Sequence, residues 1–335
     1  SSQYGGQTMY ISHLSPFVEE TRKSFRKRLV EMGLDPKSPD FESIVEKATL
    51  IDVEDGVQTF MYQLNTMSGT NGQAPFISLY MHLEDVPEGK DRDDLAMVCR
   101  KIFEQRIVGL KNASGAYVSP AFPKILYVLD EDNIHEDSKY WDLTVLAATC
   151  TSKRMVPDYI SAKIMRELKD GNVYGCMGCR SFLTVGYVDK KDPWKMTTKK
   201  KGIPKFPGRF NQGVVTINLP DVALSSKGDI EKFWYILDER LELCHRALRL
   251  RHEHLRGVKS DVAPILWQNG AIARLKPGET IDNLLYNGYS TISLGYVGLY
   301  ECVKYLTGKG HWIPEDEGGA LEFAEILLQE ENYDK

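Results

Sequence analysis

Short apolar runs alternate with amphipathic helical stretches along most of the 335 residues, and this alternation constrains the fold more than any other feature. The runs lack a clean two-residue period, as is typical of strands buried on both faces of a parallel sheet. The stretches between them are long enough to be crossover helices, so the sequence predicts a mostly parallel α/β fold. The expected strands are Phe60 to Leu64, Pro75 to Met81, Ile125 to Leu129, Phe182 to Val188, Val214 to Leu219 and Pro264 to Trp267.

The clearest helix is expected at Asp229 to Leu255. Its apolar residues recur at three- and four-residue spacing, which gives one core-facing stripe. His252 and His254, near its end, are expected to be solvated. Another helix, Asp91 to Leu110, begins with acidic residues that suit the positive end of the helix dipole. Further helices are expected at Phe17 to Met32, Val297 to Leu306 and Ala320 to Gln329.

The composition excludes several classes of protein. With 42% hydrophobic and 27% charged residues, the chain is expected to be globular and soluble. A net charge of −5 gives no general reason to expect nucleic-acid or membrane binding. No apolar run approaches the roughly 20 residues needed to span a bilayer. The first six residues have neither the basic start nor the apolar core of a signal peptide, so we expect a cytoplasmic protein.

The six cysteines are scattered and do not form a disulfide-scaffold pattern. Cys99, Cys244 and Cys302 fall on apolar helical stripes and are expected to be small buried hydrophobic residues. Cys176 and Cys179 form a CxxC pair. A structural zinc site would need a second pair of Cys or His ligands at suitable spacing, and none is evident in the sequence. The seven histidines also lack metal-ligand spacing, so no metal site is expected.

One segment, Asp189 to Arg209, carries eight Lys or Arg residues against two acidic ones in a chain that is acidic overall. Its prolines and glycines predict a loop. Two interpretations stay open for this loop. It is either a solvated excursion between two strands or a basic rim that attracts a polyphosphate.

Two segments carry more specific information. The first is Cys176-Met177-Gly178-Cys179-Arg180-Ser181, and the second is Asn211-Gln212-Gly213-Val214-Val215-Thr216-Ile217-Asn218-Leu219-Pro220, a β-branched run that opens on an amide. Together they resemble the active-site strands of the anaerobic (class III) ribonucleotide reductases, which deoxygenate ribonucleotides with protein radicals. Five further phrases resemble the same family in the same order: Tyr4 to Gln7, Ala74 to Leu79, Pro123 to Asp130, Cys150 to Tyr159 and Gly288 to Tyr296.

The resemblance implies a ten-stranded α/β barrel of the glycyl-radical enzyme type. Residues 1–335 would form the central part of this single catalytic barrel, with residues 1–50 as a helical part near the dimer interface and the effector site. A finger loop would carry Cys179 into the barrel. There a glycyl radical would take its thiol hydrogen, and the thiyl radical would remove the 3′-hydrogen of the ribose. A barrel interior keeps such a radical away from water.

Within this resemblance Cys179 is the radical cysteine, because it lies in the Met-Gly-Cys-Arg core of the motif. Met177 and Asn211 match active-site places that related aerobic reductases fill with a carboxylate and a second cysteine. The Asn211 amide can donate to and accept from ribose hydroxyls or formate. Purely structural roles stay open for three of these residues. Asn211 is then a turn residue at the beginning of a strand, Met177 fills space in the core, and Cys176 contributes only to packing.

Substrate phosphates have two candidate sites. One is a turn of small residues before the expected helix Val297 to Leu306. Such a turn offers backbone N–H groups to an anion, and Ser290 and Thr291 would add hydroxyl donors. The second candidate comprises Thr151, Ser152 and Lys153. The alternative for the first is a helix N-cap that binds no ligand.

Arg22 and Arg26 belong to a cationic cluster on the expected helix Phe17 to Met32. The resemblance places effector-binding helices near this part of the barrel, and a nucleoside triphosphate needs several positive charges. We therefore predict that both arginines bind ATP or deoxynucleoside triphosphate effectors. The alternative is an ordinary solvated helix face, partly neutralised by Glu19 and Glu20.

The resemblance further implies a homodimer that reduces ribonucleoside triphosphates with formate and depends on an S-adenosylmethionine-dependent iron–sulfur activase. The family's four-cysteine zinc site and glycyl-radical signature are not found in this sequence. Zinc is therefore expected only in the complete enzyme, and the isolated chain is predicted to be inactive. Two other functions stay open. One is a pyruvate formate-lyase-like enzyme, which would favour adjacent catalytic cysteines, and the other is a non-catalytic fragment that assembles with other pieces.

Overall fold

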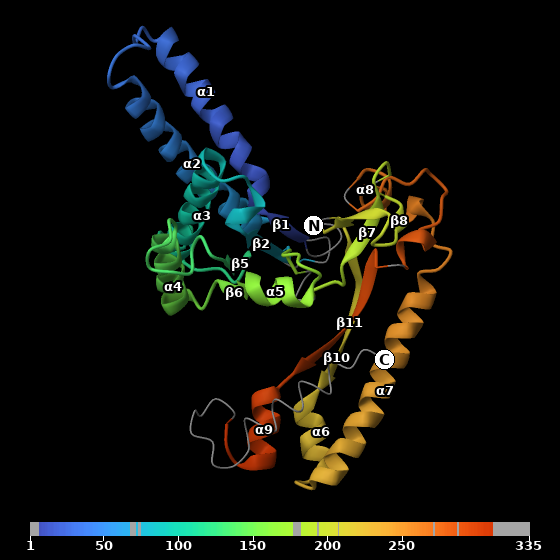
Figure 1. Ribbon diagram of the computed structural model, residues 1–335. Coiled ribbons are helices and arrows are strands. Elements are labelled where there is room, and N and C mark those ends of the chain that lie inside the picture. The colour runs from blue at the N-terminus through green and yellow to red at the C-terminus, as the bar shows by residue number, and fades with distance from the viewer. Residues whose placement is uncertain are drawn as a thin grey trace. The chain divides into compact units, whose positions relative to one another are not determined.

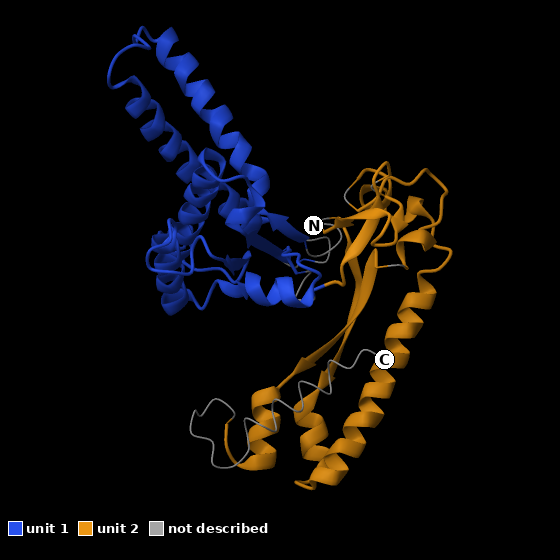
Figure 2. Cartoon of the chain, in the orientation of Figure 1, with its two compact units in different colours: residues 1–182 blue, residues 183–335 orange. Residues whose placement is uncertain are grey.

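The computed structural model describes residues 7–67, 72, 75–176, 182–192, 194–206, 208–270, 272–286 and 288–310. The chain forms two compact units, residues 1–182 and 183–335 (Figure 2). Among the described residues, no helix combines the length and the apolarity that crossing a bilayer requires. The expectation of a single catalytic barrel remains a prediction.

A four-stranded parallel sheet is the centre of the first unit (Figure 1). Its strand order is β1-β2-β5-β6, and every neighbouring pair is parallel. All five residues of β2 are buried, as expected for a strand covered on both faces. The predicted strands at 75–81 and 125–129 are therefore confirmed. The bounds are β1 Gln7–Tyr10, β2 Ile77–Met81, β5 Lys124–Leu129 and β6 Asp158–Ser161, with a small antiparallel pair of β3 Leu110–Lys111 and β4 Tyr117–Val118.

Five α-helices accompany this sheet in the described part of the first unit: α1 Ser15–Glu31, α2 Phe41–Thr66, α3 Lys90–Val108, α4 Trp141–Arg154 and α5 Ala162–Leu168. The first two form a long hairpin (Figure 1). Apolar residues of α3 such as Ile102 and Phe103 pack with Leu79 and Tyr127 of the sheet in one core. The predicted strand Phe60 to Leu64 is wrong, because these residues belong to α2. A short apolar run does not distinguish a strand from one face of a helix.

The second unit is organised around a parallel pair of strands, β10 Phe210–Asn218 and β11 Ser290–Val297. Between them the chain forms α6 Leu219–Ser226, α7 Ile230–His254 and the short α8 Pro264–Trp267, and α9 Leu299–Thr307 follows β11. Ile217 of β10 packs with Phe233 and Leu237 of α7 in the core of this unit. An antiparallel sheet of order β8-β7-β9 precedes β10, with β7 Gly186–Asp189, β8 Met196–Thr197 and β9 Gly202–Lys205.

The second unit confirms the predicted helix at 229–255 and corrects several other expectations. Pro264–Trp267 is a four-residue helix with proline in its first turn, not a strand. The basic segment 189–209 contains β8 and β9 and is therefore not only a loop. The strand expected at 182–188 is shorter, as β7. The helix expected at 320–329 lies outside the described residues.

The mixed α/β class is confirmed, but the ten-stranded barrel is not. The described strands form four separate sheets of four, three, two and two strands. The cysteines that the structure describes, which include Cys99, Cys244 and Cys302, are buried, as expected for small apolar side chains.

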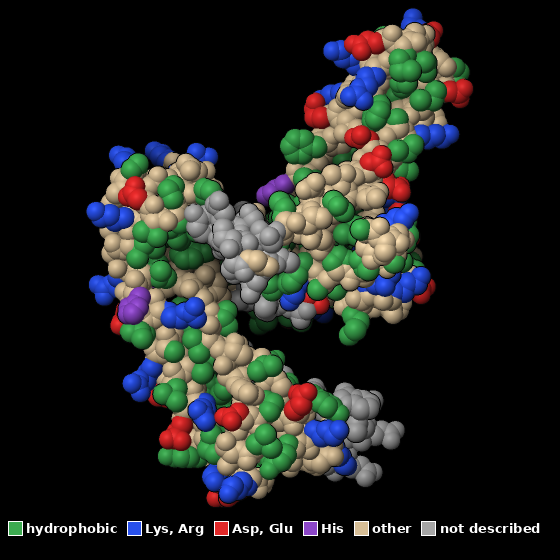
Figure 3. Space-filling model, turned by 180° about the vertical axis from the view of Figure 1, so that it is seen from behind, with side chains coloured by type: hydrophobic (Ala, Val, Ile, Leu, Met, Phe, Trp, Pro, Cys, Tyr) green, Lys and Arg blue, Asp and Glu red, His purple; other side chains and the backbone are tan. Residues whose placement is uncertain are grey.

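A buried ion pair ties together three helices of the first unit. Arg22 of α1 is only 3% exposed, and its guanidinium donates to both carboxylate oxygens of Asp94 in α3, at 2.6 Å for Nη1. Its Nε lies 2.8 Å from the Glu46 carboxylate of α2. Elsewhere on the surface of this hairpin, charges of both signs are interspersed (Figure 3).

Replacing Arg22 with glutamine is expected to lower the free energy of unfolding of the first unit by about 3–5 kcal/mol, because the buried Asp94 carboxylate would lose its partner. Lys23→Gln is the matched control. Lys23 pairs with Glu20 on the exposed face of the same helix, so its loss should leave stability nearly unchanged. Urea denaturation followed by circular dichroism measures both variants. Equal losses would contradict a structural role for Arg22.

Candidate functional site

The backbone just before the predicted radical cysteine is held by β1. The Thr8 hydroxyl donates to the Cys176 carbonyl at 2.6 Å, and the Gly175 N–H donates to the Tyr10 hydroxyl at 2.9 Å. A Cβ at position 175 would lie 3.1 Å from the Tyr80 ring, a contact tight enough that the ring would have to shift. Cys176 itself is fully buried.

Met177 and Cys179, the two predicted catalytic residues of this motif, lie outside the described residues. Their roles therefore stay predictions. The packing of Cys176 suits the interpretation that its thiol is buried filler.

Asn211 lies near the beginning of β10, next to Thr291 in the register of the parallel pair. Its side-chain Nδ2 donates to the Ser293 hydroxyl of β11, and its Oδ1 accepts from the Gly213 N–H at 2.8 Å. An amide offers two N–H donors and two acceptor lone pairs. These two bonds leave it capacity to donate to and accept from a ligand, as the predicted role requires.

Gln212 and His252 surround this strand entry, and the sequence pattern did not reveal them as a pair. The Gln212 Nε2 donates to the Ser290 hydroxyl at 2.8 Å and to the Leu285 carbonyl at 3.2 Å. Its Oε1 lies 2.8 Å from His252 Nδ1, at the end of α7. His252 is half-buried, with its ring edge-on to that of Tyr286. The expectation that His252 is solvated is therefore wrong.

Ser290 and Thr291 are placed in β11 and not in a turn before a helix. The strand covers residues 290–297, and the next helix, α9, begins only at Leu299. The geometric basis for a phosphate site at a helix N-terminus is therefore wrong at this position, because the β-branched run extends as a strand. The Ser290 hydroxyl donates to the Leu284 carbonyl at 2.7 Å. In the register of the parallel pair, Thr291 lies opposite Asn211 and Ser290 lies opposite Phe210.

Ser152 and Lys153 lie in the last turn of α4, where both are exposed. The Ser152 hydroxyl donates to the Thr149 carbonyl at 2.9 Å. The last turn carries the negative end of the helix dipole, so the backbone does not assist anion binding there. Their predicted role in substrate binding rests on the side chains alone.

The two predicted effector-binding arginines differ in their surroundings. Arg22 is buried in the ion-pair network of α1, α2 and α3 described above. Arg26 is about a third exposed and contacts the carboxylates of Glu42 and Glu19 at 2.9 and 3.0 Å. Of the two, only Arg26 is partly exposed to solvent, and its guanidinium is paired with both carboxylates.

One cation of the basic segment packs on aromatic rings. The Lys205 ammonium lies 4.3 Å from the centre of the Trp194 ring and 5.6 Å from that of Tyr289. Burial, and then the charge of Arg209, lower the pKa of Lys205. Lys205 is therefore part of the packing of the second unit. A polyphosphate rim formed by the remaining lysines stays a prediction.

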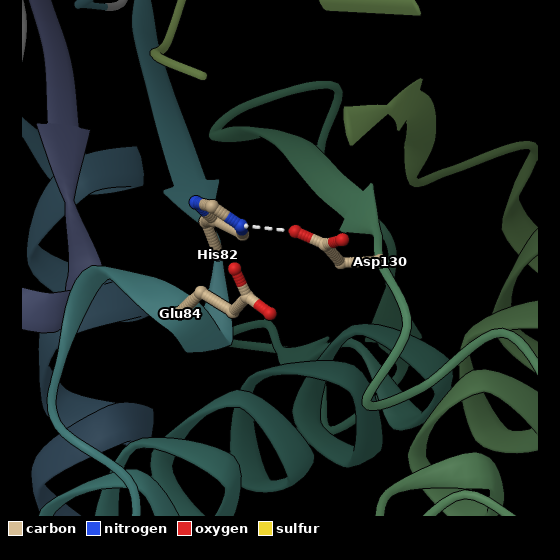
Figure 4. Close-up of side chains that lie close together, drawn as sticks. All are labelled: His82, Glu84 and Asp130. Carbon is tan, nitrogen blue, oxygen red and sulfur yellow. Dashed lines mark hydrogen bonds and ion pairs between the residues drawn. The ribbon is translucent and has the colours of Figure 1, made fainter. Parts of the chain in front are cut away.

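A cluster of ionisable residues lies where two central strands of the first unit end. His82 follows β2, Asp130 follows β5, and Arg166 comes from α5. His82 Nε2 lies 3.0 Å from the Asp130 carboxylate (Figure 4). His82 Nδ1 lies 3.0 Å from the carboxylate of Asp85. Sequence reasoning missed this cluster, although a polar residue directly after each of two predicted parallel strands was a usable signal.

The pKa values in this cluster follow from its geometry. Burial alone would lower the pKa of His82, but the hydrogen bonds to Asp85 and Asp130 outweigh it and raise the pKa. Burial opposes ionisation of Asp130, yet hydrogen bonds from Arg166 and His82 lower its pKa to about 2. The two carboxylates that contact the His82 ring therefore favour its protonated form.

The same cluster has the donor types of a metal site. One ligand atom each from His82, Glu84 and Asp130 lies within 4.8 Å of the others. However, Arg166 donates to both Asp130 oxygens, at 2.8 and 2.6 Å, and to the Glu84 carboxylate at 2.8 Å. Both ring nitrogens of His82 are also engaged. A cation is already supplied by the protein, so we interpret the cluster as a hydrogen-bonded ion-pair network.

The stability of the first unit is expected to decrease as the pH rises above about 6.5, the value of an unperturbed histidine. A raised folded-state pKa contributes stability that is complete below the unfolded pKa and is lost as the pH passes the folded one. His82→Gln should remove this component from urea titrations between pH 6 and 9. His135→Gln, at an exposed histidine, should retain it. An unchanged pH profile in His82→Gln would contradict the assignment.

Comparison with known proteins identifies the family. Residues 1–330 match the model of the family "Anaerobic ribonucleoside-triphosphate reductase". The protein of that name from Enterobacteria phage T4 is 38% identical over 318 residues, which cover 92% of this chain and 48% of the relative. The Escherichia coli K12 protein of the same name is 35% identical over 314 residues, which cover 92% of this chain and 40% of the relative. The chain thus spans about half or less of the length of the curated relatives it matches.

Solved structures support the fold. The anaerobic ribonucleotide reductase from Thermotoga maritima with dATP bound in the specificity site has a TM-score of 0.53 at 16% identity, covering 98% of this chain and 48% of that chain. The structure of the same enzyme with citrate in the active site has a TM-score of 0.52 at 16% identity. The alignment covers 98% of this chain and 51% of that chain. At this identity the likeness concerns the fold alone. On the match that extends over residues 1–330, the chain belongs to the anaerobic ribonucleoside-triphosphate reductase family.

Proposed function

We propose that this chain provides the active-site part of an enzyme that reduces ribonucleoside triphosphates to deoxyribonucleoside triphosphates. The observation that carries the proposal is the family match over residues 1–330, which includes both the Cys176 to Ser181 motif and the strand that begins near Asn211. The family match favours this reductase over a pyruvate formate-lyase-like enzyme. The finer architecture that we propose is the ten-stranded barrel of the glycyl-radical enzymes.

The proposed chemistry needs a thiol and a protected interior. A glycyl radical would take the hydrogen atom of the Cys179 thiol, and the thiyl radical would take the 3′-hydrogen of the ribose. Formate, oxidised to carbon dioxide, would supply the two electrons, and the 2′-hydroxyl would leave as water. Thr8 and Tyr10 hold the backbone of residues 175 and 176 by hydrogen bonds. These contacts support the proposal, because they fix the position of the chain directly before the motif that contains Cys179.

Asn211 is proposed to bind the ribose hydroxyls or formate. Support comes from its amide, which retains hydrogen-bonding capacity after its contacts with Ser293 and Gly213. Met177 would line the same site. Thr291, opposite Asn211 in the paired strand, and the adjacent Ser290 are proposed to contact the substrate. Ser152 and Lys153 are a second candidate contact.

Regulation and partners are also proposed from the family. The Thermotoga maritima enzyme binds dATP in a specificity site. We propose that ATP and deoxynucleoside triphosphates regulate this protein as well, with the partly exposed Arg26 better suited to contact them than buried Arg22. We further propose that the complete enzyme is a homodimer, contains zinc, and is activated by an S-adenosylmethionine-dependent iron–sulfur activase.

In the activated enzyme, Cys179→Ala is expected to abolish deoxynucleotide formation while the glycyl-radical signal in electron paramagnetic resonance remains, because the thiyl step follows radical installation. Cys176→Ala is the matched control, since this thiol is buried, and it should retain substantial activity. Product is measured by chromatography under strict anaerobiosis. An inactive Cys176 variant together with an active Cys179 variant would reverse the assignment.

A further inference from the structure

The direction in which Asn211 points is set by an irregularity in β10. Along a regular strand, residues two apart share a face, so Asn211 would lie on the same face as Val215 and Ile217. That face is covered by α7: Ile217 is buried in the core with Phe233, and Val215 packs against it. A regular strand would therefore direct the Asn211 amide toward the helix.

The register shows that the strand is not regular. Asn211 pairs with Thr291, but Val214 already pairs with Ser293, so Gln212 and Gly213 together lie opposite one residue of β11. This extra residue is a β-bulge, which is rare between parallel strands and changes the face on which the following residues lie. Asn211 consequently shares the face of Ser293, and its amide donates to that hydroxyl.

Side chains from the end of α7 hold the bulge. The Arg251 Nη1 donates to the Val214 carbonyl at 2.8 Å, and its guanidinium packs against Gly213. A Cβ at position 213 would lie 3.0 Å from Arg251 Cζ, and the φ of +150° is one that other residues rarely adopt. The Gln212 side chain is fixed between His252 on one side and Ser290 and Leu285 on the other.

The hydrogen bonds of Gln212 identify the ring nitrogen through which His252 donates. The Gln212 amide nitrogen donates to Ser290 and Leu285, so the oxygen that faces His252 is an acceptor. His252 must therefore carry its hydrogen on Nδ1 and donate it to Gln212 Oε1. This bond connects the last turn of α7 to the residue that directly follows Asn211.

We infer that Gln212 and His252 are positioning residues: by fixing the bulge, they turn the Asn211 amide to the face of β10 and β11 that α7 does not cover. The inference rests on the proposed function, in which that amide contacts the substrate or formate. Neither residue needs to touch the reacting atoms. Their effect on the reaction would pass through the orientation of Asn211.

The kinetic test is a double-mutant cycle in the activated enzyme. His252→Phe keeps a ring against Tyr286 but removes the donor, and we expect it to lower kcat by about ten-fold, with KM nearly unchanged, through the loss of one hydrogen bond. His252→Asn, which can present an amide N–H at the same place, should restore most of the rate. His254→Phe, at an exposed histidine of the same helix, is the matched control and should behave like the unaltered enzyme.

The decisive comparison is the double variant Asn211→Ala with His252→Phe. If His252 acts only through Asn211, the double variant will be no slower than Asn211→Ala alone. The inference would be overturned if the rate losses of the two single variants multiply in the double variant. Equal rates for His252→Phe and His254→Phe would also overturn it. Thermal denaturation of each variant separates a loss of orientation from a loss of folding.

A crystal structure of the His252→Phe chain gives a readout that does not depend on activity. We expect Gln212 to leave its place and the bond between Asn211 and Ser293 to lengthen or break. An unchanged Asn211 would refute the positioning role, whatever the kinetics. If instead Asn211→Ala is fully active while the structural shift is seen, the proposed catalytic use of Asn211 fails and the positioning role stands.

Discussion

Parallel pairing between strands far apart in the sequence is the constraint on which the second unit depends. For β10 and β11 to run in the same direction, the chain must return from the end of one strand to the beginning of the other. The long helix α7 makes most of this return, so its last turn arrives where both strands begin. That is why Arg251 and His252, forty residues beyond the bulge in sequence, contact it in space.

In the first unit the corresponding constraint is the placement of charge in a poorly solvated interior. Arg22 and Asp94 are both almost fully buried, and each satisfies the other. His82 bridges two carboxylates at the ends of β2 and β5, and Arg166 donates to the Asp130 carboxylate as well. Apolar packing alone does not fix the relative position of two elements. Charge-assisted hydrogen bonds do, because the donor and acceptor must be aligned.

Sequence reasoning succeeded where one physical signal dominated. The strands at 75–81 and 125–129 are continuous apolar runs buried on both sides, and the helix at 229–255 has one regular stripe. It failed at 60–64, where an apolar stretch of a 26-residue helix imitates a strand, and at 264–267, where four residues suffice only for one turn. The bulge was not predictable from Asn211 to Gly213 alone, since it exists only in relation to the register of β11. The site motifs were recognised from the sequence, whereas the contacts of Gln212 and His252 required the fold.

The bulge also has a consequence for how the sequence of β10 can vary over evolutionary time. Deleting one residue at 212 or 213 would restore a regular strand. Every side chain on one side of the deletion would then exchange faces, so that either Asn211 or the pair Val215 and Ile217 would be misdirected. A substitution can be compensated locally, but a change in length here cannot. The number of residues between Asn211 and Ile217 is therefore constrained, in addition to the identities of Gln212 and Gly213.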